Sequence, residues 1–181
     1  WAAFNNGFSV PFVQAVALSS DGLTIFAAVN SYGVFKSTNG GASWAAVNNG
    51  LTHGYVVSLA LTSDDQTILA GAPGGGVFKS IDGGTSWAAV NNGLTNQLVY
   101  SIAVSSNGQT IVAGTPGGVF KTTDGGTSWA AVNNGLTNQN LFSLALSSDG
   151  QTILAGAQGG VFKTTDGGNS WVTVNNGLNI Q

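Results

Sequence analysis

Residues 121–129 read Lys-Thr-Thr-Asp-Gly-Gly-Thr-Ser-Trp, and this stretch decides the fold because the chain contains it, with small changes, four times. The other copies occupy residues 36–44, 79–87 and 163–171, and the first of these carries Asn39 in place of the aspartate. The five tryptophans, at positions 1, 44, 87, 129 and 171, give a period of 42 or 43 residues. A period of this length indicates a repeat architecture, in which neighbouring units bury a core that no single unit could bury alone.

Four short strands are predicted in each unit, and the third unit serves as the example. Residues 99–104 alternate in size, which places Tyr100, Ile102 and Val104 on one face and two small residues on the other. This pattern suits a strand that is held between two close sheets. The other three strands are expected at residues 110–114, 119–122 and 129–132.

Turn signals, rather than helical segments, separate these strands. Asn-Gly or Asp-Gly follows most of the first strands, a glycine-rich turn follows the second, and the Asp-Gly-Gly loop follows the third. Such sequences favour the tight turns of β-hairpins. No segment has the apolar periodicity of a helix. The predicted fold class is therefore all-β, with four-stranded antiparallel sheets.

A four-stranded sheet that recurs about every 42 residues predicts a β-propeller. Radial packing is the physical reason, because an isolated sheet leaves its faces wet and its edges unpaired. We expect a single domain over residues 1–181, with an outer strand at 1–8 followed by four complete blades. The blades are expected at residues 9–51, 52–94, 95–136 and 137–181.

One outer strand is surplus, because the fourth strand occurs once more than the other three. Three interpretations account for it: a four-bladed ring with a spare strand, two chains that form an eight-bladed ring and exchange outer strands, or a segment of a longer propeller. An open arc would expose apolar faces, so we expect closure within the chain or by a homo-oligomer. The chain has no methionine, so we expect a processed product or an excerpt. Near-identical units are typical of recent amplification and also of design.

The motif Ser/Thr-x-Asp-Gly-Gly-x-Ser-Trp resembles the Asp-box, or BNR repeat, of sialidases, sortilin-type receptors, xyloglucanases and photosystem assembly factors. The resemblance covers nearly the whole chain. It implies propeller blades whose boxes lie on the face opposite the usual binding site. The residues assigned to the boxes are Ser37, Asn39, Trp44, Ser80, Asp82, Trp87, Thr122, Asp124, Trp129, Thr164, Asp166 and Trp171.

The chemistry of the box is that of a structural lock. The Asp124 carboxylate can accept hydrogen bonds from backbone N–H groups of the turn that follows it. Gly125 and Gly126 permit a positive φ, and Trp129 supplies a large apolar plate between sheets. One carboxylate per loop falls far short of the six to eight oxygen ligands of calcium, so no metal site is predicted. Asn39 replaces the carboxylate in the first copy, and we expect that box to be looser.

The composition excludes several classes of function. Four lysines, no arginine and a net charge of −3 cannot supply the many cationic contacts that nucleic acids need. The absence of cysteine rules out disulfides and thiolate zinc sites. It also suits a secreted protein, so we expect an extracellular or cell-surface location. The apolar runs are too short for a membrane span.

A hydrolase is not expected. The seven acidic residues are all aspartates; three belong to boxes, and four lie in turns between first and second strands, which should share the box face. A glycosidase needs two opposed carboxylates across its substrate, and a sialidase-like site would also need arginines, which the chain lacks. His53, the only histidine, cannot build a His–His metal site. Neither catalytic residues nor a cofactor are predicted.

The loops opposite the boxes are the candidates for ligand binding. They comprise the segments after each Asn-Asn-Gly-Leu and the turns between second and third strands. Amides can form hydrogen bonds with sugar hydroxyls, and the tyrosine rings beside them can stack on sugar rings. The alternative interpretation is that these polar loops only cap the ring. The candidate residues are Tyr32, His53, Tyr55, Asn96, Gln97, Asn138, Gln139, Asn140 and Gln158.

The predicted function is that of a non-catalytic scaffold or interaction module with a protein or glycan ligand. A multivalent carbohydrate-binding propeller is the alternative, and a glycoside hydrolase is a third class that the residue inventory disfavours. The repeated lysines are expected on a solvated strand edge, where charge discourages edge-to-edge association. They are Lys36, Lys79, Lys121 and Lys163.

Overall fold

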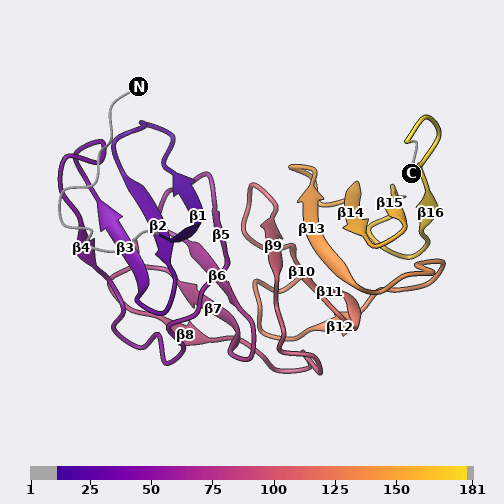
Figure 1. The fold of residues 1–181 in the computed structure, drawn as a ribbon, viewed down its shortest axis with the longest axis horizontal. Helices are drawn as coiled ribbons and strands as arrows, with labels where there is room; N and C mark the ends of the chain where they lie inside the picture. Colours follow the sequence, from indigo (N-terminus) through magenta and orange to yellow (C-terminus); the bar gives the residue numbers. More distant parts are fainter. Residues whose placement is uncertain (1–11, 179–181) are drawn as a thin grey trace.

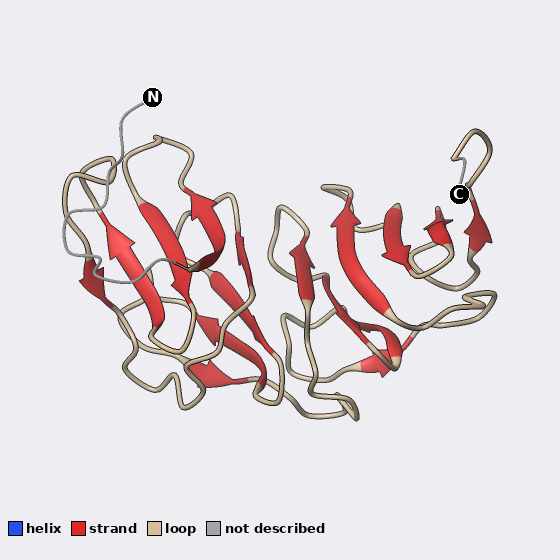
Figure 2. Ribbon diagram, in the orientation of Figure 1, coloured by secondary structure: helices blue, strands red, loops and turns tan. Residues whose placement is uncertain are grey.

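The computed structural model describes residues 12–178, which contain strands and loops but no helix (Figure 2). These residues form four sheets, and each strand pairs antiparallel with its neighbours in the sequence. The predicted fold class, an all-β propeller of four-stranded antiparallel blades, is confirmed.

The sixteen strands of this part of the chain are short. The first sheet contains β1 (Val13–Leu18), β2 (Ile25–Val29), β3 (Gly33–Ser37) and β4 (Ala45–Ala46), and the second contains β5 (Ser58–Leu61), β6 (Ile68–Ala72), β7 (Gly76–Ser80) and β8 (Ala88–Ala89). The third contains β9 (Ser101–Val104), β10 (Ile111–Thr115), β11 (Gly118–Thr122) and β12 (Ala130–Ala131), and the fourth contains β13 (Leu141–Leu146), β14 (Ile153–Ala157), β15 (Gly160–Thr164) and β16 (Val172–Thr173).

The four sheets follow one another as blades along an arc (Figure 1). The first strand of each sheet lies on the concave side of the arc, and the short fourth strand lies at its periphery. The first and last sheets lie at opposite ends. The surplus outer strand expected at residues 1–8 falls outside the described residues.

A β-bulge in the inner strand changes one prediction. Ser101 pairs with Gly114, but the Tyr100 N–H also donates to the Gly114 carbonyl, so two residues oppose one. The register of β13 shifts at the corresponding place. Val99 is therefore buried beside Ile102, whereas Tyr100 is exposed, so the prediction that Tyr100 lies on one face with Ile102 and Val104 is wrong.

The core lies between successive sheets, and its composition repeats. Phe26 and Val34 of the first sheet pack against the second sheet, which contributes Ile68, Phe78 and Trp87. Equivalent residues fill the two other interfaces. Because the second and third sheets have a neighbour on each side, β6 and β10 are buried along their whole length.

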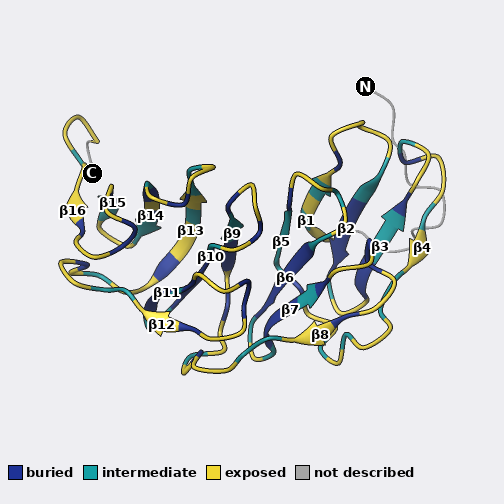
Figure 3. Ribbon diagram, turned by 180° about the vertical axis from the view of Figure 1, so that it is seen from behind, coloured by how far each residue is buried: buried dark blue, intermediate teal, exposed yellow. Residues whose placement is uncertain are grey.

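Among residues 12–178, no further sheet covers the outward faces of the first and last sheets. Large apolar side chains are exposed on β1 at Val13, Val16 and Leu18, and on β14 at Leu154. The ribbon of β6, in contrast, has the colour of buried residues (Figure 3). Within residues 12–178, the first and last sheets therefore do not pack together into a four-bladed ring.

We expect Phe78→Ala to lower the free energy of unfolding by about 3–5 kcal/mol, because the ring is only 2% exposed and its removal leaves a cavity between two sheets. Ile81→Ala is the matched control on the surface and should change it by less than about 0.5 kcal/mol. Urea unfolding monitored by tryptophan fluorescence measures the free energy of unfolding of both variants. Equal losses in the two variants would contradict the packing described above.

Candidate functional site

Each Asp-box is a closed hydrogen-bond network in the loop between the third and fourth strands. In the third sheet, Thr122 Oγ1 donates to Asp124 Oδ1 at 2.6 Å and accepts from the Gly126 N–H at 3.1 Å. Ser128 donates its N–H to Asp124 Oδ1 at 2.9 Å and its hydroxyl to Oδ2 at 2.7 Å. Gly125 and Gly126 adopt φ angles of 69° and 98°, which favour glycine. One side chain thus ties both ends of the loop.

The first box keeps this network with an asparagine. Asn39 Oδ1 accepts from the Ser37 hydroxyl and the Ser43 N–H, both at 2.9 Å, and its Nδ2 donates to the Ser43 hydroxyl at 2.9 Å. In the aspartate boxes the equivalent serine hydroxyl is the donor. The asparagine reverses the direction of one hydrogen bond and keeps all three. The hydrogen bonds therefore give no sign of the looser box that we expected from the sequence.

The network also holds the carboxylates in their charged form, which hydrogen bonds to the charged oxygens favour. The pKa of Asp82 is lowered to about 2, mainly by the hydrogen bond from the Ser86 hydroxyl. The pKa of Asp124 is likewise lowered to about 2, mainly by the hydrogen bond from the Thr122 hydroxyl. Neighbouring hydroxyls also lower the pKa of Asp21, Asp64, Asp149 and Asp166.

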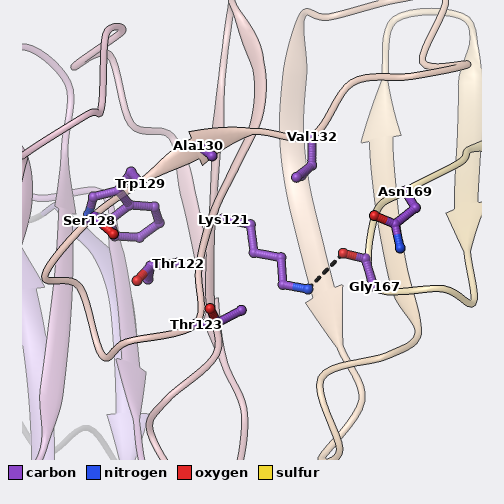
Figure 4. Close-up of a pocket in the computed structure, with 9 residues that line it drawn as sticks. All are labelled: Lys121, Thr122, Thr123, Ser128, Trp129, Ala130, Val132, Gly167 and Asn169. Atoms are coloured by element: carbon purple, nitrogen blue, oxygen red, sulfur yellow. Dashed lines mark hydrogen bonds between the residues drawn. The ribbon is translucent and has the colours of Figure 1, made fainter.

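Two further side chains of each repeat connect a sheet to its neighbours. The Trp129 Nε1–H donates to the Val90 carbonyl of the preceding sheet at 2.6 Å. Lys121 reaches in the other direction, and its Nζ donates to the Gly167 carbonyl of the following sheet at 2.8 Å (Figure 4). Both bonds recur along the arc. The prediction of a solvated strand edge is therefore wrong for the three lysines that have a following sheet.

A groove of about 260 Å³ lies beside this lysine, between the third and fourth sheets (Figure 4). Lys121 and Trp129 line it from one sheet, and Gly167 and Asn169 line it from the next. A groove of about 250 Å³ has the equivalent position between the second and third sheets. Because the groove recurs at successive sheets, we interpret it as a feature of the repeat and not as a single specialised site.

The first asparagine of each Asn-Asn-Gly within residues 12–178 has a structural role that the sequence pattern did not reveal. Asn91 Oδ1 accepts from the Val77 N–H at 2.7 Å, and Asn91 Nδ2 donates to the Gly75 carbonyl at 3.0 Å. These bonds fix the turn between the second and third strands. The signal that could have identified the residue is its recurrence in every unit. The equivalent clamps are Asn48, Asn133 and Asn175.

The two groups of candidate ligand-binding loops lie together at the end of the sheets opposite the boxes. The Gly74 and Gly76 N–H groups both donate to the Gln97 carbonyl. The His53 Nε2 lies 3.0 Å from the Pro73 carbonyl oxygen. The loop that enters one sheet thus contacts a turn of the same or the preceding sheet. We call these joined loops the loop surface.

The candidate side chains of the loop surface differ in what they do. Tyr32 and Tyr55 are exposed, at 55% and 40%. Asn96 and Asn138 each accept a hydrogen bond at 3.0 Å from the N–H two residues later, so both stabilise their own loops. The remaining amides are exposed. They are Gln97, Gln139, Asn140 and Gln158.

Two aromatic residues beside the loop surface were not among the predicted candidates. Tyr100 and Phe142 are exposed because the bulge takes them out of the contact between sheets. Both directly follow candidate loops in the sequence. An aromatic residue at the same repeat position in two units is the signal that could have identified them.

The described part of the chain contains neither a metal-binding cluster nor a membrane-spanning helix. Among residues 12–178, no three side chains of His, Cys, Asp or Glu lie together in a way that could hold a metal ion. The same residues include no helix that could cross a membrane.

The arc of sheets and the box network together define a β-propeller built from Asp-box repeats. The chain belongs to the family described as photosynthesis system II assembly factor YCF48, whose model matches residues 36–179. The comparison with curated protein sequences found no match.

Solved propeller structures superpose on most of this chain. An ancestral GH74 enzyme is 28% identical over 90% of this chain and 24% of its own, with a TM-score of 0.72. The GH74 xyloglucanase from Xanthomonas campestris is 15% identical over 90% of this chain and 30% of its own, with a TM-score of 0.69. The RRP9 WD40 repeats are 14% identical over 93% and 52%, with a TM-score of 0.73. The chain thus spans between about a quarter and about half of these structures.

The lowered pKa values predict a loss of stability in acid. Asp82 and Asp124 have a pKa of about 2 in the folded chain against an ordinary value of 3.8, so protonation favours the unfolded chain. We expect the melting temperature to hold from neutral pH to about pH 4 and to fall between about pH 4 and 2. Circular dichroism at constant ionic strength measures it. A melting temperature that stays constant down to pH 2 would disprove the contribution of the boxes.

The first box predicts which substitutions the other boxes tolerate. Asp124→Asn should keep the three bonds that Asn39 makes and change the melting temperature by less than about 2 °C. Asp124→Ala removes the acceptor and leaves the Ser128 N–H without its partner, so we expect a loss of about 5 °C or more. Calorimetry on both variants tests the difference, and equal melting temperatures would contradict it.

Proposed function

We propose that this chain is a non-catalytic propeller scaffold that binds a partner through its loop surface. The state of the carboxylates is the observation that carries the proposal. All seven aspartates already accept a hydrogen bond from a serine or threonine hydroxyl. Hydrogen bonds of this kind lower the pKa of six of these carboxyl groups, those of Asp21, Asp64, Asp82, Asp124, Asp149 and Asp166. A glycosidase instead needs one carboxyl group with a raised pKa as its general acid.

The family and fold relationships support a role in binding. The family is described as an assembly factor, and WD40 repeats are among the similar structures. The GH74 enzymes share the fold, but the chain covers only 24% and 30% of the two described above. A shared fold does not by itself carry an activity.

A hydrolysis assay tests the proposal. We expect no release of reducing sugar from xyloglucan, and no cleavage of a fluorogenic sialoside, above the buffer rate at neutral pH. Asp82→Asn is the matched control because asparagine can preserve the box. Turnover by the parent chain that disappears in an Asp→Asn variant would reject the proposal.

A multivalent carbohydrate-binding propeller is the second candidate. Exposed aromatic rings and exposed amides on the same surface favour it, since rings stack on sugars and amides bond their hydroxyls. The rings are those of Tyr32, Tyr55, Tyr100 and Phe142.

A glycan array tests this second candidate. We expect a hit whose affinity falls about tenfold or more in Tyr55→Ala, because the ring is the stacking surface. Ile81→Ala, an exposed position beside the second box, should leave binding unchanged. An array without hits would reject the sugar alternative and leave the scaffold proposal standing.

A further inference from the structure

The two ends of the arc carry the two halves of one interface. The first half is the leading face, which we define as the face of the first sheet turned away from the second. Val13 on this face is 48% exposed, whereas its counterparts Val56, Val99 and Leu141 in the later sheets are at most 1% exposed. The repeat therefore places a core residue on the leading face. Two further apolar residues of the same face are also exposed, Val16 at 66% and Leu18 at 59%.

The second half is the trailing face, which we define as the face of the fourth sheet turned away from the third. Leu154 on this face is 39% exposed, whereas its counterparts Phe26, Leu69 and Val112 are fully buried against the following sheet. The trailing face thus presents the surface that the first three sheets present to their neighbours.

Polar groups on the two faces are complementary in the same way. The counterparts of Lys163 each donate to the first glycine carbonyl of the following box, and Gly40 has this position in the first sheet. The Ser101 hydroxyl accepts from the Leu144 N–H of the following inner strand at 2.9 Å. Ser143 on the trailing face is the counterpart of Ser101, and Val16 on the leading face is the counterpart of Leu144. The trailing face therefore offers the Lys163 donor and the Ser143 acceptor. The leading face offers the matching Gly40 carbonyl and Val16 N–H.

We propose that a second copy of this chain closes the ring, with the leading face of each copy against the trailing face of the other. The result is an eight-bladed ring of two chains with two equivalent head-to-tail interfaces. The three internal interfaces of the chain are the template for both. The size of the ring follows from the count of blades, because each copy contributes four sheets. The inference is independent of which ligand the loop surface binds.

Mass in solution tests the proposal. Sedimentation velocity on the 18.1 kDa chain should give twice that mass at micromolar concentration and a monomer on sufficient dilution. Val16→Glu and Leu154→Glu each place a charge in the proposed interface, so we expect either to raise the dissociation constant about 100-fold or more. Lys163→Ala, which removes only one hydrogen-bond donor, should raise it about tenfold.

Ile81→Glu is the matched control. This residue is 71% exposed and lies beside the groove between the second and third sheets, away from both end faces. It should leave the dimer unchanged. Circular dichroism should show the parent strand content in every variant, and Lys163→Ala keeps the test valid if a glutamate variant fails to fold.

A mixing experiment distinguishes the head-to-tail ring from other dimers. Val16→Glu retains an intact trailing face, and Leu154→Glu retains an intact leading face. An equimolar mixture should therefore form a dimer through one intact interface, although each variant alone is monomeric. A parent chain that is monomeric at all concentrations would overturn the proposal. So would open polymers, or a mixture of the two variants that stays monomeric.

Discussion

The contact of one sheet with the next is the constraint on which the rest of this structure depends. A four-stranded sheet with apolar residues on both faces is not stable alone in water, and β6 is buried throughout because the sheets on either side cover it. Trp129 reaches back across this contact and Lys121 reaches forward. Both side chains bond backbone carbonyls, so the contact does not require a particular partner side chain. Nearly identical units can therefore follow one another.

The Asp-box makes this contact repeatable. Ser128 directly precedes Trp129 and is held to Asp124 by two hydrogen bonds, which position the indole at the start of the fourth strand. This structural use occupies the carboxylates of the chain at one end of the sheets. The loop surface at the other end carries amides, tyrosines and one histidine. These side chains offer hydrogen-bonding groups and aromatic rings rather than formal charges.

The same architecture serves different purposes in the proteins that this chain resembles, which include GH74 enzymes and WD40 repeats. Their common property is the scaffold, and function resides in the loops that it positions. In this chain the strands, the boxes and the Asn-Asn-Gly turns repeat, whereas the loop surface varies from unit to unit, and Tyr55 has Leu98 and Asn140 as its counterparts.

The sequence by itself determined the repeat period, the four strands of each unit, the box and the propeller. All of these depend on residues that lie close together in the chain or recur at a constant interval. Only the tertiary structure decided that Lys121 bonds Gly167, 46 residues away, and that a bulge turns Tyr100 out of the core. It also decided that, within residues 12–178, Val13 and Leu154 of the end sheets are exposed although their counterparts in the other sheets are buried. These features depend on which neighbouring sheet a side chain meets, and a linear pattern of residue types does not specify a neighbour.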